Sequence, residues 1–174
     1  MHIYCLFCQT QRTRQIAEVI QATLDIQCIS PKIVQRLWVK GEEQHKIHEY
    51  LPGYLFLYSE TPIRSFGDIR PIEGVFRLLG SAESGYELAG ADRAFAEILY
   101  DMGGTLGILQ GLDTGDRVRL DSELYHGFSG EITRLDRRKG RAQIEFDFDG
   151  KAQKVWVGLD IIRPEEPSPG EQQS

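Results

Sequence analysis

Short runs of alternating apolar and polar residues dominate the chain. A period of two residues places every second side chain on the same face of a strand, so these runs predict sheets with one buried face. Glycine and proline separate the runs, and the polar segment 40–44 reads as a hairpin tip. In the first two thirds of the chain, strands are predicted over residues 32–39, 46–50 and 75–79, with a buried strand over 3–7 and a strongly apolar, aromatic strand over 54–58.

In two longer segments, apolar residues recur at helical spacing. Residues 12–24 and 91–102 each carry an apolar stripe, which for the first is formed by Ile16, Val19, Ile20 and Leu24. A short helix is also expected over residues 62–69, before Pro71 and Gly74. Alternating strands and helices of this kind predict an α+β sandwich in which helices cover an antiparallel sheet.

The last third of the chain contains only strand patterns. Alternating runs over residues 118–120, 131–136, 142–148 and 154–157 are separated by turns, one of which contains Gly127 and Gly130. Such short runs predict a small, strongly bent antiparallel sheet. We therefore expect a first domain over residues 1–106, a linker over 107–114, a small all-β domain over 115–163 and a disordered tail over 164–174.

Charge points to a local anionic partner. The net charge is −6, yet residues 134–141 contain five basic side chains and one acidic one. Like charges so close together repel, which favours contact with an anion such as nucleic acid at this turn alone. No apolar run is long enough to span a membrane, and no secretory signal is recognisable. Three cysteines without a disulfide framework favour a reducing cytoplasm, and we expect a monomer without membrane contact.

Catalytic chemistry is not expected. Cys5 and Cys8 have the C-x-x-C spacing, but they fall on a predicted strand, where residues three apart point to opposite faces. Core packing is therefore the favoured interpretation, and Cys28 reads as a further core residue. His45 and His48 lie on a predicted hairpin without partner ligands. We expect no catalytic residue, no metal site and no cofactor, and hence no enzyme.

Motifs in both parts of the chain resemble one family. Gly115-Asp116-x-Val118, Gly127-Phe128-x-Gly130 and Lys139-Gly140-Arg141 are similar to the KOW motif of transcription and ribosomal proteins. Leu51-Pro52-Gly53-Tyr54 and Arg70-Pro71-Ile72-Glu73-Gly74-Val75 resemble segments of the NusG N-terminal domain. The chain is thus identified as resembling NusG-type transcription elongation factors. The resemblance implies an N-terminal NGN α/β sandwich followed by a KOW domain, a small SH3-like barrel.

The resemblance also implies a protein partner. In that family the N-terminal domain binds the clamp helices of the largest RNA polymerase subunit through an apolar, aromatic surface. Carried over by motif, the candidates for this surface are Leu51 and Tyr54, with Tyr4 and Phe7 of the first strand beside them. The alternative for Phe7 is burial in the core, because strand alternation must bury one face.

The chain departs from housekeeping NusG in the small domain. The R-x-T-P element that helps NusG bind Rho or the ribosome is absent, and residues 146–155 stand in its place. Residues 135–139 and 157–162 look closer to LoaP, a specialised antiterminator. LoaP-type proteins recognise an RNA hairpin in the nascent leader, and Arg side chains suit phosphate and guanine contacts. The RNA-contact candidates are Arg134, Arg137, Arg138, Lys139 and Arg141, joined by Arg117, Lys151 and Lys154.

Three further residues are weaker candidates for nucleic-acid contact. Arg12 and Arg14 begin the first predicted helix, where its dipole disfavours cations, and Lys40 lies where the family approaches non-template DNA. Three alternatives to the RNA-recruited antiterminator remain open: a general NusG, a ribosome-associated KOW protein, and, remotely, a redox enzyme using Cys5 and Cys8.

Overall fold

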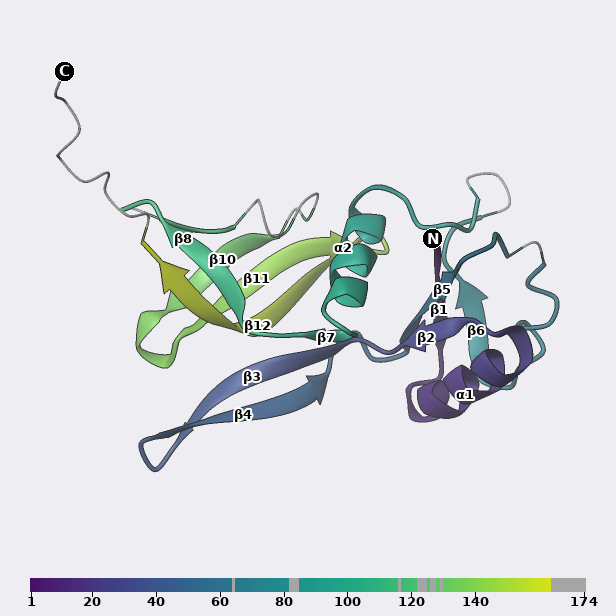
Figure 1. Cartoon of the computed structure of the whole chain (residues 1–174), viewed down its shortest axis with the longest axis horizontal. Helices are drawn as coiled ribbons and strands as arrows, with labels where there is room; N and C mark the ends of the chain where they lie inside the picture. The colour runs from purple at the N-terminus through teal and green to yellow at the C-terminus, as the bar shows by residue number, and fades with distance from the viewer. Residues whose placement is uncertain are drawn as a thin grey trace, which may run out of the picture.

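The computed structural model describes residues 1–63, 65–81, 85–115, 117–121, 125, 128 and 130–163. Figure 1 shows two bodies side by side, an N-terminal sheet with α1 and a C-terminal barrel, with α2 between them. We call residues 1–106 the larger domain and residues 109–163 the small domain. Among the described residues, no helix is long and apolar enough to cross a membrane.

A four-stranded antiparallel sheet forms the centre of the larger domain. Its order is β2-β5-β1-β6, and its strands are β1 (His2–Cys8), β2 (Gln27–Ile29), β5 (Tyr54–Ser59) and β6 (Val75–Leu78). Helix α1 (Thr13–Leu24), preceded by the 3-10 turn η1 (Thr10–Arg12), covers one face through Ile16 and Ile20. Helix α2 (Gly90–Asp101) covers the other face through Phe95 and Leu99.

A separate three-stranded sheet extends from the larger domain. Strands β3 (Lys32–Val39) and β4 (Glu42–Glu49) form a long antiparallel hairpin, and β7 (Thr105–Leu106) pairs with β3 in parallel. In Figure 1 this hairpin reaches along the barrel, and β3 contacts β12 of the small domain. The hairpin therefore gives the two domains a second contact besides α2.

The small domain is a five-stranded sheet in the order β10-β11-β12-β8-β9. Strands β11 (Arg141–Phe148) and β12 (Lys151–Ile162) are its longest, and the 3-10 turn η2 (Arg137–Lys139) connects β10 (Glu131–Asp136) to β11. Strands β8 (Leu109–Asp113) and β9 (Val118–Leu120) complete it. The edge strands β9 and β10 contact each other, which bends the sheet toward a barrel.

Strand alternation explains the two cores. On β1, Ile3 and Cys5 face α2 whereas Leu6 and Cys8 face α1. The core on the α2 side continues into the small domain through Ile144, Phe146 and Phe148. A single hydrophobic core therefore joins the two domains.

Four details of the sequence prediction are wrong. Residues 109–113 of the expected linker form β8, which pairs in parallel with β12, so the small sheet is not purely antiparallel. The described part of residues 62–69 forms irregular backbone and a turn rather than a helix. Val19 is exposed, because the inward stripe of α1 is narrower than expected. The last strand extends over Lys151–Ile162 rather than residues 154–157.

Asp116 and Gly127 of the KOW-like motif and the tail 164–174 lie outside the described residues.

Candidate protein and nucleic-acid interfaces

Three of the four residues expected to bind polymerase lie on the same side of the four-stranded sheet. Phe7, Leu51 and Tyr54 gather on the α2 side, where the Phe7 and Tyr54 ring centroids are 5.0 Å apart. Phe56 follows two residues after Tyr54 and shares its face. We call these four residues the aromatic face.

Tyr4 does not belong to the aromatic face, and its prediction as a neighbour of Tyr54 is wrong. It lies in the core beneath α1, with its ring edge-on to Phe66 at 5.4 Å. Its hydroxyl accepts a hydrogen bond from the Ile63 amide at 3.1 Å. The reason is parity: Tyr4 and Phe7 are three positions apart on a strand, so their side chains point to opposite faces.

The small domain covers the aromatic face. Phe148 of β11 lies edge-on to Tyr54 at 5.3 Å between centroids and 5.4 Å from Phe56. Phe146 stacks on Phe95 of α2 at 5.0 Å. Leu51 is 4% exposed and Tyr54 is 7% exposed. The surface expected to meet another protein is thus buried inside the molecule, an arrangement that we call closed.

A polar cluster borders this contact at Asp149. The Tyr54 hydroxyl donates to Asp149 Oδ2 at 2.9 Å, and Arg77 of β6 forms an ion pair with the same oxygen. The Asp149 amide donates to both carboxylate oxygens of Asp92 on α2 at 3.3 Å. Burial and the hydrogen bond to Asp149 raise the pKa of Tyr54 to about 12. These contacts tie the β11–β12 turn to three elements of the larger domain.

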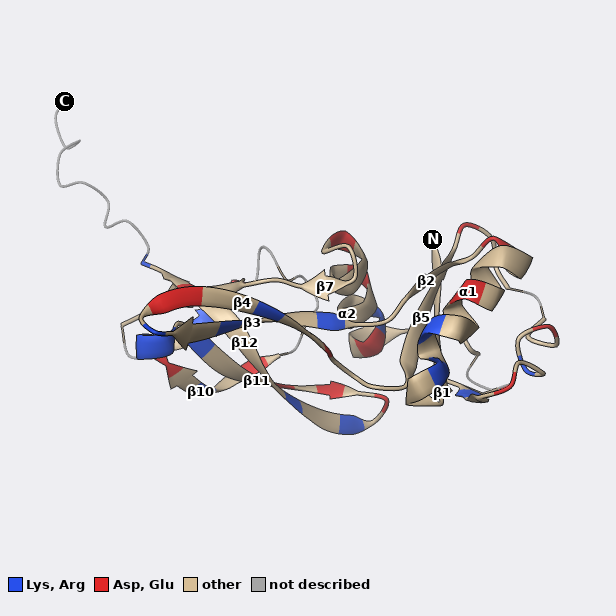
Figure 2. Cartoon of the chain, turned by 90° about the horizontal axis from the view of Figure 1, so that it is seen from below, with Lys and Arg blue, Asp and Glu red and all other residues tan. Residues whose placement is uncertain are grey.

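Six of the eight predicted RNA-contact residues cluster at the opposite end of β11. Asp136 accepts a hydrogen bond from the Lys139 amide at 3.1 Å and so stabilises η2. We call residues 137–141 the basic turn. The side chains of Arg138 and Lys139 are exposed at its tip. Figure 2 shows positive charge gathered at this connection, beside β3.

Two arginines of the basic turn are held by neighbours. Arg137 pairs with Asp113 of β8 at 3.1 Å. Hydrogen bonds from the Gly115 amide and then from Arg137 lower the pKa of the Asp113 carboxyl. The Arg141 guanidinium pairs with Asp136 and lies over the Trp156 ring, 4.7 Å from its centroid. Both guanidinium groups are therefore preoriented.

A groove between the edge strands β9 and β10 extends the basic surface. It has a volume of about 370 Å³, and Arg117, Arg134 and Arg137 line it together with Thr133. Lys151 and Lys154 are not part of this cluster. Lys151 pairs with Phe148 at the other end of β11, and Lys154 forms an ion pair with Glu145 midway along the strand.

The weaker nucleic-acid candidates are dispersed. Arg12 pairs with Glu73, and Arg14 pairs with Glu18 one helical turn away. Lys40 lies at the exposed tip of the β3–β4 hairpin. The structure does not bring these three side chains together with the basic turn.

The cysteines have the environment of core residues. Cys5 and Cys8 belong to opposite cores, as strand alternation predicts. Burial raises the pKa of all three thiols, that of Cys28 to about 12, which disfavours the reactive thiolate. In the described ranges, no three His, Cys, Asp or Glu side chains are grouped as a metal site would need.

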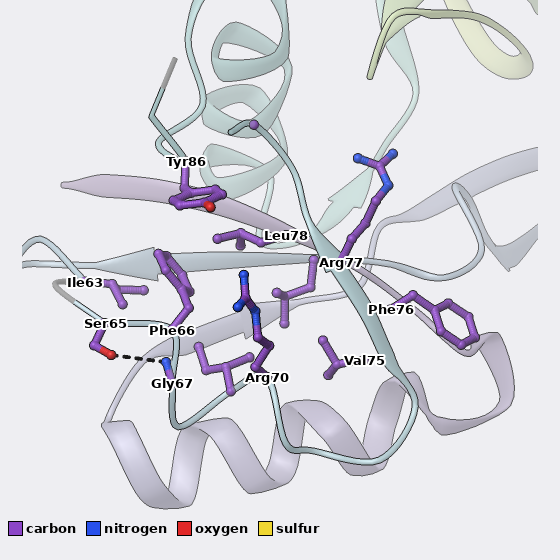
Figure 3. A pocket seen from close by; sticks show the side chains of 13 residues that line it. Ile63, Ser65, Phe66, Gly67, Arg70, Val75, Phe76, Arg77, Leu78 and Tyr86 are labelled. Carbon is purple, nitrogen blue, oxygen red and sulfur yellow. Dashed lines mark hydrogen bonds between the residues drawn. The ribbon is translucent and has the colours of Figure 1, made fainter. Parts of the chain in front are cut away.

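A cavity lies on the α1 side of the four-stranded sheet. It has a volume of about 720 Å³ and lies between β6 and the segment before it (Figure 3). Phe66 and Tyr86 form one wall, and Arg70 points between them and Val75 (Figure 3). The ionisable groups among its described lining residues are Arg70, Arg77 and Tyr86, so the described wall offers no carboxylate or imidazole.

Sequence reasoning did not single out three residues that join the domains. Asp149 and Arg77 form the polar cluster at the aromatic face, and Arg36 of β3 contacts the basic turn. An Asp-Gly pair at Asp149 is a hairpin signal, but its partners lie 72 and 95 residues away in sequence. Nothing in the local pattern points to those partners.

Comparisons with known proteins agree with this architecture. A family model described as transcription termination factor NusG matches residues 1–94. The solved structure of domain interaction in Thermotoga maritima NusG is similar, with a TM-score of 0.52 and 15% identity, over 90% of this chain and 92% of that chain. At this identity the likeness concerns the fold alone, and it confirms the expected fold class. No curated protein sequence matches the chain.

Proposed function

Since this chain belongs to the NusG family of transcription factors, whose members bind RNA polymerase, we propose that it is a processive antiterminator recruited by an RNA hairpin in the nascent leader. The observation that carries this proposal is the basic turn. Arg138 and Lys139 are exposed, and Arg137 and Arg141 are preoriented on either side of them. Guanidinium groups fixed in this way suit phosphate oxygens and guanine edges.

The groove beside the turn suits RNA backbone. The groove lies between β9 and β10, the two edge strands of the five-stranded sheet. It is lined by Arg117, Arg134 and Arg137. A-form RNA is usually read by shape and through its phosphates, loops and bulges. A stem that meets the groove while its loop meets Arg138 and Lys139 would engage both surfaces.

The aromatic face is the proposed polymerase-binding surface, with Phe7, Leu51 and Tyr54 as contact residues. Because β11 covers this face, polymerase binding requires the domains to separate. One feature destabilises the closed arrangement and so favours separation. The Tyr50 ring packs on Phe95 and Phe146, but its buried hydroxyl has no hydrogen-bond partner among the described residues. An unpaired buried hydroxyl costs about 1–3 kcal/mol.

A purified transcription system tests the function. With polymerase, an intrinsic terminator and a candidate leader hairpin, we expect read-through that depends on both the protein and the leader. Read-through without any leader would indicate a general NusG instead. Retention on ribosomes without co-purification of polymerase would indicate a ribosome-associated KOW protein.

The RNA surface has its own test. Arg138→Ala with Lys139→Ala removes two exposed charges at the tip of the basic turn, and we expect weaker leader binding. The slope of log affinity against log salt should fall by roughly two, about one for each lost phosphate contact.

Lys151→Ala with Lys154→Ala is the matched control for charge. These lysines lie away from the basic turn, so the salt slope should stay near that of the wild type. Equal effects of the two double variants in a salt titration would contradict a localised RNA site.

A further inference from the structure

The cavity on the α1 side has an aromatic wall that is held in place. Phe66 lies edge-on to the buried ring of Tyr4 at 5.4 Å and edge-on to Tyr86 at 5.5 Å between centroids. Ile69 is only 1% exposed and anchors the same segment in the core beneath α1. We call this space of about 720 Å³ the Arg70 cavity. Its wall is preformed, as is usual for small-molecule sites.

A short turn places Arg70 at the cavity. The Arg70 amide donates to the Phe66 carbonyl oxygen at 2.9 Å, and the Ile69 amide donates to the same oxygen at 3.2 Å. The turn therefore brings Arg70 back beside the Phe66 ring. Its guanidinium points into the space between Phe66 and Val75 (Figure 3). Arg70 is an exposed residue, so this cation can be reached from solvent.

Arg70 also differs from its neighbours in having no carboxylate partner. Each of the other described arginines of the larger domain forms an ion pair with a carboxylate: Arg12, Arg14, Arg36, Arg77 and Arg93. Arg70 forms none with any residue that the structure describes. Arg77 lines the cavity too, but its guanidinium is paired with Asp149. Arg70 is thus the cation that a ligand in the cavity would meet.

The other polar side chains of the described wall can donate hydrogen bonds. Ser65 Oγ accepts from the Gly67 amide at 3.1 Å, which leaves the hydroxyl hydrogen able to donate. The Tyr86 hydroxyl can donate as well. Ile63, Val75 and Leu78 make much of the remaining surface apolar. Donors and a cation on an apolar wall suit a ligand with an apolar body and an anionic group.

The size and the charge of the cavity narrow the class of ligand. Small-molecule sites usually measure roughly 300–1,000 Å³, and the Arg70 cavity lies within that range. Phe66 and Tyr86 favour an aromatic ring, which can stack offset or edge-on against them. One guanidinium matches one carboxylate through two parallel hydrogen bonds. A phosphate monoester, with a charge of about −2, would remain partly uncompensated.

From this geometry we propose that the Arg70 cavity binds an aromatic monocarboxylate. The carboxylate pairs with Arg70, and the aromatic body lies against Phe66 and Tyr86. The site uses neither the basic turn nor the aromatic face. The inference therefore does not depend on the proposed RNA-dependent function.

A matched pair of probes tests the site. Full-length ¹⁵N-labelled protein is titrated at low salt with 1-naphthylacetate and followed by two-dimensional NMR. We expect saturable shifts of the amide signals of residues 66–70 and 75–78. The uncharged 1-naphthylacetamide has the same ring and nearly the same shape. It should bind about fivefold more weakly, between the effect of an exposed ion pair and that of a charge-assisted hydrogen bond.

Three variants assign the recognition to the cavity. Arg70→Gln should lose the preference for the acid over the amide, and this double-mutant comparison isolates the ion pair. Arg14→Gln is the matched control, because it removes an arginine whose side chain is 91% exposed on α1, and the preference should stay unchanged. Val75→Phe adds volume to the cavity wall and should weaken both probes. The NMR spectrum of each variant also shows whether it is folded.

Each contrary result overturns a definite part of the proposal. Equal affinity for the acid and the amide would overturn the recognition of a carboxylate. A preference for the acid that survives in Arg70→Gln would overturn the role of Arg70. Absence of saturable shifts at residues 66–70 and 75–78 with both probes would overturn the cavity as a ligand site. None of these results bears on leader RNA binding, which the salt titration tests separately.

Discussion

Asp149 contacts three elements of the larger domain, through Tyr54 of β5, Arg77 of β6 and Asp92 of α2. It occupies the left-handed region with a φ of 54°, followed by Gly150 with a φ of 67°. Asp-Gly is a preferred pair for two-residue hairpins because both positions need positive φ. The turn that closes β11 onto β12 therefore also presents a carboxylate to Tyr54 and Arg77. Hairpin formation and domain contact depend on the same side chain.

Asp92 weakens the contact that it helps to form. Burial is the largest cause that raises the pKa of Asp92, and the charges of Asp149 and Asp147 raise it further. The closed arrangement thus disfavours the ionised carboxylate, while it needs an acceptor for the Asp149 amide. The free-energy cost of keeping Asp92 ionised in the closed arrangement is fully present above the raised pKa. It vanishes as the pH falls below the pKa of an exposed aspartate, about 3.9.

Asp92→Asn should therefore stabilise the closed protein. The amide oxygen still accepts from Asp149, whereas the charge is gone. In urea denaturation at pH 7 we expect a higher free energy of unfolding than in the wild type, and a difference that shrinks as the pH is lowered through the raised pKa. A variant that is less stable at pH 7 would show that the carboxylate charge strengthens the hydrogen bond by more than its desolvation costs.

Strand β8 shows how an element can be hidden in a sequence. Its residues look like a Gly-rich linker, but Gly111 lies in the sheet between β12 and β9. A Cβ at this position would lie 2.8 Å from Val118 Cγ1 and 3.2 Å from Leu159 Cδ1. The glycine is therefore a packing requirement of the barrel and not a mark of flexibility.

Gly111→Ala distinguishes a strand from a linker. Overpacking of a close contact costs about 1–3 kcal/mol, so the free energy of unfolding should fall by that order. Gly107→Ala is the matched control, since its Cβ would meet nothing within 4 Å. Chemical denaturation of the two variants gives the comparison. Equal, near-zero effects would mean that residues 109–113 contribute little to the small domain.

The sequence was most informative for the central strands. The apolar runs of β1 and β5 predicted both strands, which are buried on both faces, and strand parity predicted that Cys5 and Cys8 face opposite cores. Where motif resemblance was followed without regard to parity, as for Tyr4, the placement was wrong. β8 was missed because its run is short and includes glycine, so the alternating pattern that marks a strand is interrupted.

At the scale of the molecule, the contact between the domains is the feature that could not be predicted from local sequence patterns. Arg36 and Gly140 are 104 residues apart, and Tyr54 and Asp149 are 95 apart. Each side chain is ordinary in its own strand, and its importance arises from packing between distant segments. The basic turn was found from charge alone, because its residues are consecutive, whereas the covering of the aromatic face depends on the path of β11 across α2.

That covering makes domain separation sensitive to alkaline pH. The pKa of Tyr54 is raised to about 12 in the closed protein, by burial first and by its hydrogen bond to Asp149. An exposed tyrosine has a pKa of about 10. The protonated phenol therefore stabilises the closed arrangement fully below about pH 10, and this contribution is lost as pH rises toward 12. An ionised Tyr54 would also repel Asp149.

We accordingly expect the radius of gyration measured by small-angle X-ray scattering to increase between about pH 10 and 12, while circular dichroism shows the strands intact. Burial raises the pKa of Tyr50 and Tyr58 as well, beyond that of Tyr54, so these phenols ionise later. Tyr54→Phe lacks the titrating hydroxyl and the hydrogen bond to Asp149. It should be more separated at neutral pH and insensitive over this range. A pH-dependent expansion that persists in Tyr54→Phe would assign the sensitivity to another group.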